Sequence, residues 1–165
     1  MTIPMTIPDF AEGVHYRQLK GGKYRFELLK DITVKLPSFV PNDKRISFRD
    51  FNRREWVRII GNKYTIRAEY RWNGSSPKWW VPLIGWVGTP DPVKSRLASC
   101  WHDTAFQFLR VADYPINYYD ANDIFHGIME AAGFRFSNVY HGAVKDLGQY
   151  FFSDYPERGE HSVIL

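Results

Sequence analysis

The sequence predicts an α+β fold in which an N-terminal antiparallel β-sheet of about four to six strands precedes a C-terminal cluster of three helices. Segments in the first half of the chain alternate between apolar and polar residues, as strands do. Segments in the second half carry apolar residues at helical spacing. A segment rich in Pro, Gly and Trp separates the two halves. Because no linker-like boundary interrupts this order, we expect a single domain over residues 1–165.

The β-rich part is predicted over residues 23–72, after an extended arm at residues 1–22 in which prolines disfavour a helix. Its clearest strand is Lys63–Trp72, where apolar and polar side chains alternate throughout. Such alternation is typical of an antiparallel strand with one buried face. The apolar face of this strand would carry Tyr64, Ile66, Ala68, Tyr70 and Trp72. Shorter strands are expected at 23–31, 32–36 and 55–60, and a loop at 37–45.

An aromatic loop is predicted over residues 73–91, between the β-rich and helical parts. The stretch 73–92 contains four Pro and three Gly, so we expect no regular structure there. The same stretch carries Trp79, Trp80 and Trp86. A loop this apolar is expected to pack onto the rest of the molecule or to cap a pocket.

The helical part is predicted over residues 92–152. Asp91 and Pro92 form a typical helix start, with an acidic N-cap followed by Pro at the first helical position. Asp120 is the expected N-cap of the second helix, and Gly133 is suited to end it because Gly readily adopts positive φ. The helices are expected over about 92–110, 120–132 and 138–152, followed by a mobile polar tail at 153–165.

Composition limits the function classes that fit the chain. The single cysteine, Cys100, excludes an internal disulfide framework and a cysteine-based zinc cluster, and it fits a reducing compartment. No run approaches the roughly 18 apolar residues of a membrane span, and the N-terminus does not resemble a signal peptide. The net charge is +4, and residues 1–60 hold 12 basic against 7 acidic residues. This asymmetry could favour an acidic partner, but we interpret it as a solvated sheet face together with basic loops and do not expect nucleic-acid binding.

The stretch 99–108, SCWHDTAFQF, places two ionisable side chains among aromatic residues. Helical spacing puts His102 on the apolar face with Ala105 and Phe106, and Asp103 lies 100° away at the boundary of that face. A histidine that faces the core needs a hydrogen-bond partner. A carboxylate on the neighbouring helix would fix its tautomer, and Asp123 is the expected partner.

The second helix offers further candidates with alternative explanations. Asp123 lies three residues after Asp120, where a capping-box acid would be placed, so a structural role is equally open. Asp123 and His126, at i and i+3, could share a metal ion, although His126 also fits a residue at the edge of the apolar face. His141 is expected to be half exposed beside the apolar face of the third helix.

Taken in order, these elements resemble the phage and prophage proteins grouped as domain-of-unknown-function family 1353. The resemblance covers about residues 20–150, and it implies a tailed-phage or prophage origin without implying an established activity. A virion or host-cytoplasm location would follow from it. The matching segments are the turn Asn73–Pro77, His102-Asp103 with Phe106, Ala121–Phe125, and Tyr140–Val144 with Gly148.

A more local likeness concerns chemistry. A His-Asp pair followed three residues later by an aromatic residue, with an Asp on the next helix, is similar to secreted phospholipase A2. That likeness would make His102 the general base, Asp103 a calcium ligand and Asp123 the residue that orients His102. Carbonyl groups of the turn 73–76 would complete an oxygen-rich calcium site. The cysteines that frame those enzymes are absent here.

Two functions from different classes remain open. The first is a small phage hydrolase, dependent on a divalent metal such as calcium or zinc, that acts on ester or amide bonds of the cell envelope. His102 and Asp123 would be its catalytic residues, and Asp103 and His126 its metal ligands. The second is a non-catalytic virion or tail component, or a host-directed binding protein, in which the His-Asp-Asp cluster joins two helices. Its partners would be other virion proteins or a component of the host envelope.

Overall fold

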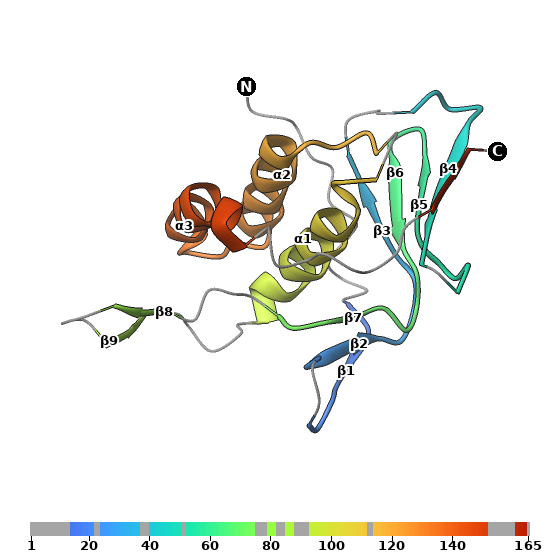
Figure 1. The fold of residues 1–165 in the computed structure, drawn as a ribbon. Coiled ribbons are helices and arrows are strands. Elements are labelled where there is room, and N and C mark those ends of the chain that lie inside the picture. The colour runs from blue at the N-terminus through green and yellow to red at the C-terminus, as the bar shows by residue number, and fades with distance from the viewer. Residues whose placement is uncertain are drawn as a thin grey trace.

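The computed structural model describes residues 14–21, 24–36, 40–50, 52–74, 79–81, 85–87, 93–111, 114–151 and 161–164. Within them, strands precede three helices, and one more strand follows (Figure 1). The α+β prediction is therefore confirmed. The helices are α1 (Arg96–Phe108), which a 3-10 turn at Val93–Ser95 precedes, α2 (Tyr118–Ala131) and α3 (Ser137–Phe151). The strands are β1 (Tyr16–Gln18), β2 (Phe26–Leu28), β3 (Ile32–Lys35), β4 (Arg45–Arg49), β5 (Glu55–Ile60), β6 (Lys63–Ile66), β7 (Arg71–Trp72), β8 (Trp79–Val81), β9 (Gly85–Val87) and β10 (His161–Ile164).

The strands form two sheets and one hairpin, all of them antiparallel. A three-stranded sheet has the order β1-β2-β7, a five-stranded sheet has the order β10-β4-β5-β6-β3, and β8 pairs with β9 alone. The helices lie on one side of the five-stranded sheet, and α1 lies between that sheet and α2 (Figure 1). The opposite face of the sheet therefore points away from the helices.

The five-stranded sheet has one apolar face and one polar face, because its strands alternate. The row Ile46, Ile59, Tyr64 and Val34 crosses β4, β5, β6 and β3 and is buried. The register shifts between Phe48 and Arg49, so that Arg49 pairs with Glu55. Such a bulge inserts one extra residue into a strand and reverses the side on which the following residues lie. It places Glu55 on the polar face, although its spacing from Val57 and Ile59 would place it inside.

The predicted strand Lys63–Trp72 is wrong as one strand, although its apolar face is largely right. The segment divides into β6 and β7, which belong to different sheets. Between them Glu69 has a φ of 68°, and its N–H donates to the carbonyl of Leu28 at 2.8 Å. Tyr64, Ile66, Tyr70 and Trp72 are buried on either side of this turn. The alternation therefore reports burial correctly, but it cannot show that the chain leaves one sheet for another.

Five further strands lie where the sequence predicts none. β1 lies within the expected arm, β4 starts at the last residue of the expected loop 37–45, β8 and β9 form a hairpin within the aromatic loop, and β10 lies in the tail expected to be mobile. β1 pairs with β2, and β10 pairs with β4. The pairing partners of short strands are distant in sequence, so local composition predicts them poorly.

The ranges of the three helices agree more closely with the prediction than those of the strands do, but the starts of the first two helices differ from it. Asn117, not Asp120, caps α2: its side-chain oxygen accepts a hydrogen bond from the N–H of Asp120 at 2.9 Å. Gly133 has a φ of 65° just after α2, as predicted. The first helix begins at Arg96, later than expected, and the proposed cap at 91–92 lies outside the described residues.

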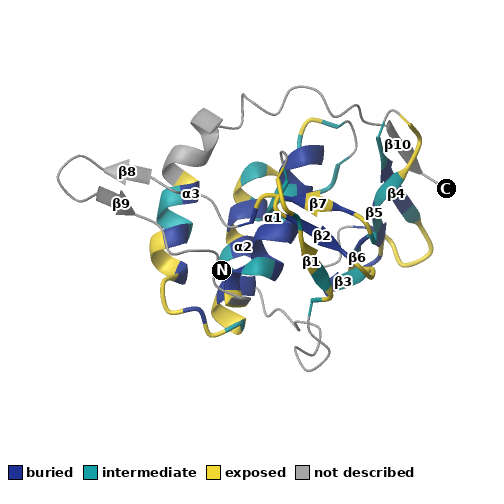
Figure 2. Ribbon diagram, turned by 90° about the horizontal axis from the view of Figure 1, so that it is seen from below, coloured by how far each residue is buried: buried dark blue, intermediate teal, exposed yellow. Residues whose placement is uncertain are grey.

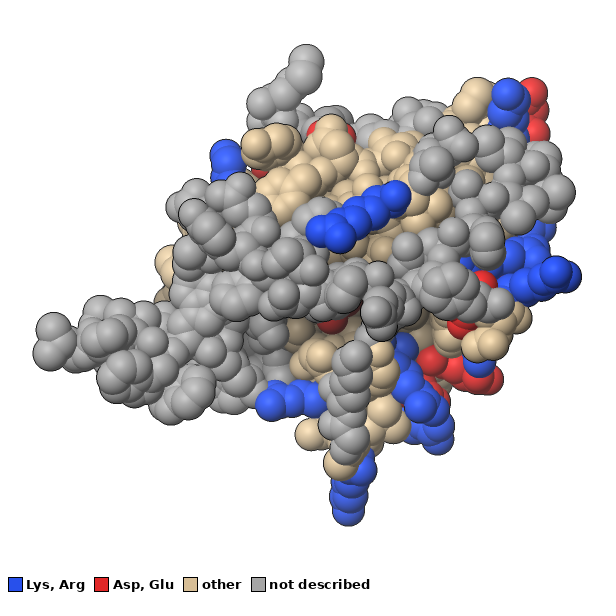
Figure 3. All heavy atoms as spheres, in the orientation of Figure 1, with Lys and Arg blue, Asp and Glu red and all other residues tan. Residues whose placement is uncertain are grey.

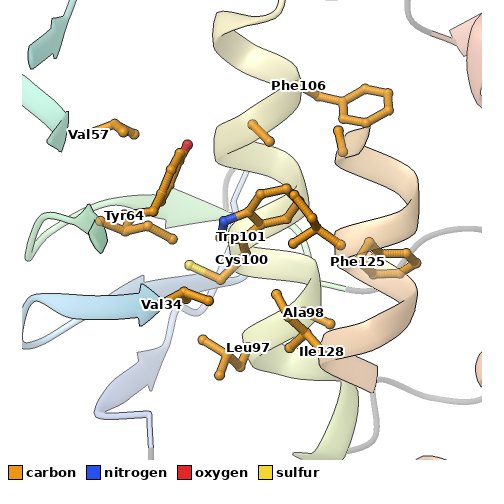
Figure 4. Packing of buried hydrophobic residues seen from close by; sticks show 14 of the residues in the cluster. Val34, Val57, Tyr64, Leu97, Ala98, Cys100, Trp101, Phe106, Phe125 and Ile128 are labelled. Atoms are coloured by element: carbon orange, nitrogen blue, oxygen red, sulfur yellow. The ribbon is translucent and has the colours of Figure 1, made fainter. Parts of the chain in front are cut away.

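Most of the core is formed on the two sides of α1, as the buried residues in Figure 2 show. On the sheet side, Trp101 contacts Tyr64 with ring centroids 5.7 Å apart, and Phe108 contacts Phe48 at 5.5 Å. On the α2 side, small residues such as Ala98 allow α1 and α2 to approach closely (Figure 4). α1 is therefore a central element with little surface of its own.

Two further observations concern the free cysteine and the apolar character of the helices. Cys100 is a free, fully buried thiol, and burial raises its pKa well above the usual value, so it is unsuited to act as a nucleophile. Among the described residues, no helix combines the length and apolar character that membrane crossing requires.

Candidate functional site

His102 lies in the contact between α1 and α2. Its ring stacks against Phe106 with centroids 4.0 Å apart and against Phe125 at 4.7 Å. Its Nε2 atom lies 3.2 Å from Oδ1 of Asn122. The residue thus faces α2, as helical spacing predicts, but its polar partner is a neutral amide.

Burial controls the protonation of His102. Desolvation lowers its pKa to about 4, although the hydrogen bond with Asn122 acts in the opposite direction. At neutral pH the ring is therefore uncharged, and its Nε2–H donates to Asn122 Oδ1. A base with this pKa accepts protons poorly near pH 7, where a general base is most effective with a pKa close to the working pH. These properties are typical of a histidine that joins two helices.

The prediction that Asp123 is the partner of His102 is wrong. Asp123 is 59% exposed in its side chain and accepts a hydrogen bond from Nε2 of His141 at 3.1 Å. Asn122, only 1% exposed, faces α1 instead. Consecutive helical residues point about 100° apart, so only one of this pair can face α1. The spacing of Asn122 with the buried residues Phe125 and Met129 is the signal that identifies it.

Asp103 lies apart from this contact. It is half-buried, and its Oδ2 atom lies 3.5 Å from the backbone N–H of Asn73, a long contact in which that N–H faces the carboxylate. The calcium site expected here needs backbone carbonyl oxygens, whereas Asn73 presents a donor. Ser75 and Ser76, the last two residues of the expected turn 73–76, lie outside the described residues.

His126 and His141 form a stacked imidazole pair between α2 and α3. Their ring centroids are 4.5 Å apart and the ring planes differ by 16°. Nε2 of His126 lies 2.9 Å from Oδ1 of Asn138 and 3.6 Å from Oε1 of Glu130. The other ring, that of His141, donates from its Nε2 to the carboxylate of Asp123, as described above. We call these five residues the imidazole cluster.

The imidazole cluster unites Asp123 and His126, two of the four predicted site residues, but not His102 and Asp103. Sequence reasoning missed His141 and Asn138, which lie three residues apart at the start of α3. Asp123, His126 and Glu130 follow a line along α2, and this spacing was the available signal. Within the part of the chain that the structure describes, no group of three or more His, Cys, Asp and Glu side chains is arranged to hold a metal ion.

The polar face of the five-stranded sheet forms a third candidate, which we call the basic sheet face. It comprises the outward residues of β3 to β6 and the ion-paired residues Asp31 and Arg67 beside the strand ends. Lys35 and Lys63 lie opposite each other and are exposed. The charged residues of this face are Asp31, Lys35, Arg45, Arg49, Glu55, Arg58, Lys63 and Arg67.

Glu55 is the acidic centre of the basic sheet face. It accepts hydrogen bonds from Ser47 at 2.5 Å, Arg45 at 2.6 Å and Arg58 at 2.5 Å. Burial raises its pKa, but these hydrogen bonds outweigh burial and lower the pKa to about 2. The side chains of Arg45 and Arg58 are 36% and 29% exposed, so both also reach solvent. Ser47, Arg45 and Arg58 thus hold the carboxylate oxygens of Glu55.

The three candidate sites differ in what they can do. The His102 contact is partly buried among aromatic rings and uncharged, the imidazole cluster has a histidine oriented by a carboxylate at the surface, and the basic sheet face offers several cationic donors. Comparison of the chain with protein-family models, curated proteins and solved structures found no match.

Proposed function

We propose that this chain is a non-catalytic bacteriophage protein that acts by binding, either as a virion or tail component or as a host-directed protein. The observation that supports it best is the environment of His102. The residue expected to be the catalytic base packs against Phe106 and Phe125, and among the described residues its polar contact is with the amide of Asn122. Within the described part of the chain, no carboxylate hydrogen-bonds to the ring, as one would have to in order to make it a stronger base.

A binding role gives the His102–Asn122 contact a structural purpose. Because buried polar atoms need partners, a hydrogen bond between α1 and α2 favours one alignment of the two helices. Asn122 Nδ2 is also buried and has no hydrogen-bond partner among the described residues. A misaligned pair would leave further buried polar atoms unsatisfied, at about 1–3 kcal/mol each.

The phage setting of this proposal rests on the resemblance described above, over about residues 20–150. Action in the virion or in the host cytoplasm follows from that setting. The partners would be other virion proteins or a component of the host envelope. Detection of the chain in purified virions with an antibody would favour the virion role over the host-directed one.

The proposal predicts that His102→Ala lowers the free energy of unfolding by about 2–3 kcal/mol, because it opens a cavity and removes the partner of Asn122. Calcium or zinc ions should leave the melting temperature of the wild-type protein unchanged. Thermal denaturation with and without each ion provides both measurements. His15→Ala, at an exposed residue, is the matched control and should have little effect. A metal-dependent rise in melting temperature would contradict the proposal.

The imidazole cluster supports a second candidate, a metal-assisted hydrolase centred on His141. Asp123 can orient this ring and raise its basicity. This alternative predicts hydrolysis of a chromogenic ester in the presence of calcium or zinc, with a loss of about 100-fold or more in His141→Gln. His102→Gln should retain that activity. The binding proposal predicts instead no hydrolysis above the buffer rate, so one assay with the three proteins separates the two functions.

A further inference from the structure

We propose that the basic sheet face binds the phosphate backbone of double-stranded nucleic acid without reading its sequence. This inference rests on the proposed binding role and names the partner of that role. It departs from the expectation drawn from the sequence, in which no nucleic-acid binding is expected. The pairing register of the strands brings four of the twelve basic residues of the first 60 positions onto one face, together with Lys63 and Arg67.

The basic sheet face accounts for the whole net charge of the protein. It carries six basic and two acidic residues, hence +4, and the chain carries 22 basic and 18 acidic residues, also +4. The residues elsewhere, sixteen of each sign, balance. The isoelectric point is about 9.2. A high isoelectric point with Lys and Arg gathered on one face is the electrostatic pattern of nucleic-acid binding.

The residue types on this face match those that contact phosphate oxygens. The row Arg58, Thr65 and Thr33 crosses β5, β6 and β3 and combines partly exposed hydroxyl groups with a guanidinium, whereas Ser47, at the β4 end of this row, is buried and donates to Glu55. The oxygens of Thr33 and Thr65 lie 2.9 Å apart, so the hydroxyl groups are already aligned. Arg, Lys, Ser and Thr side chains supply most contacts to nucleic-acid backbones. With strands about 4.8 Å apart, β5, β6 and β3 present these groups over about 10 Å.

The internal ion pairs leave part of this charge available. Glu55 is held by Arg45 and Arg58, and Asp31 pairs with Arg67. Lys35 and Lys63 extend the face at one end and are exposed. In Figure 3 this face is seen from the side, and Lys and Arg lie along the edge of the molecule formed by the sheets, with Asp and Glu among them. The two acidic residues offset only a third of the basic charge, so the field of the face remains positive.

The face fits other anionic partners less well. Single-stranded nucleic acids are usually held by aromatic side chains on which bases stack, and the outward positions of β3 to β6 that form this face carry Thr, Lys, Arg, Ser, Glu and Ile. Protein interfaces usually have an apolar or aromatic centre. The exposed large apolar residue of this face is Ile60, at 39%. A duplex, which presents phosphates at its surface, needs neither feature.

The test is fluorescence anisotropy of a short labelled DNA duplex of arbitrary sequence, titrated with the full-length protein at several salt concentrations. The wild-type protein should bind with an affinity that falls steeply with salt, with a logarithmic slope of about −3 to −4 if about four phosphates are neutralised. K35E/K63E should weaken binding at low salt by about tenfold or more and reduce the slope by about two. Both residues are exposed, so the variant should fold normally.

The matched control is R135E/K145E, which changes the net charge by the same amount at exposed residues of the helical part. It should bind nearly as tightly as the wild-type protein. Three outcomes would overturn the proposal: no binding to the duplex at low salt, an equal loss in both variants, or stronger binding to phosphatidylserine vesicles or polyglutamate than to the duplex. The thermal denaturation of His102→Ala does not involve this face. That experiment can therefore contradict the binding role, whereas the duplex titration can contradict the choice of partner alone.

Discussion

Acidification from pH 6.5 to pH 4 is expected to cost the folded protein about 2–3 kcal/mol through His102 alone. The pKa of His102 falls from the usual 6.5 to about 4 on folding, because the ring is desolvated between α1 and α2. Between these values the unfolded chain binds a proton that the folded protein does not bind. The contribution is therefore complete above pH 6.5 and is lost as the pH falls through this window, at about 1.4 kcal/mol per pH unit at most.

His102→Gln tests this expectation, because glutamine keeps a polar group near Asn122 and does not titrate. Urea denaturation at intervals between pH 7 and pH 4 should show a much shallower decline for the variant than for the wild-type protein. His141→Gln is the control, since His141 is held at the surface by Asp123. It should leave most of the decline in place. If His102→Gln declines as steeply as the wild-type protein, the ring is not enclosed in solution.

Glu55 and Glu27 should affect the stability of the fold at lower pH than His102 does. The carboxylate of Glu55, with a pKa of about 2, contributes stability above its usual pKa that is lost as the pH falls toward 2. Glu27 is buried between Arg17 and Arg71, whose hydrogen bonds outweigh desolvation and lower its pKa. The stability contributions of Glu55 and Glu27 are lost mostly at lower pH than the contribution of His102. The stability curve is therefore expected to fall in two stages.

The helices and the fold class could be predicted from the sequence because they depend on local information. Repeated apolar residues three and four positions apart indicate one buried face, and Gly133 marks the end of α2 without reference to any other segment. The strands depend on partners far along the chain. β10 pairs with β4, more than a hundred residues earlier, and nothing in the composition of either segment indicates the other.

The candidate site could be predicted only in part, for a geometric reason. Spacing shows that His102 faces the neighbouring helix, but the identity of its partner depends on the rotation of α2. A difference of one position exchanges Asp123 for Asn122, and this changes the expected chemistry from a base with a carboxylate partner to an uncharged contact. The basic sheet face was missed for a similar reason, because the register of four strands and a bulge after Phe48 determine which charges meet.

The largest loss of stability is expected at Trp101, the residue immediately before His102. Its side chain is fully buried between α1 and the sheet, where it packs against Tyr64 (Figure 4). Trp101→Ala would remove the indole and leave a cavity in a core that has little freedom to collapse. The free energy of unfolding should therefore fall by about 3–5 kcal/mol, which can exceed half of the stability of a small domain.

Trp101→Phe separates packing from hydrogen bonding at the same position. The Nε1 atom of Trp101 is buried and has no hydrogen-bond partner among the described residues, so phenylalanine removes part of the ring without breaking a polar contact. The expected loss is about 2 kcal/mol or less. Urea denaturation of the two variants, with Phe136→Ala as a control at a 51% exposed residue, gives the comparison. Equal losses in the two Trp101 variants would contradict the expectation that lost ring packing dominates. A graded loss would establish that the packing of Trp101 against Tyr64, on the sheet side of α1, is what stabilises the fold at this position.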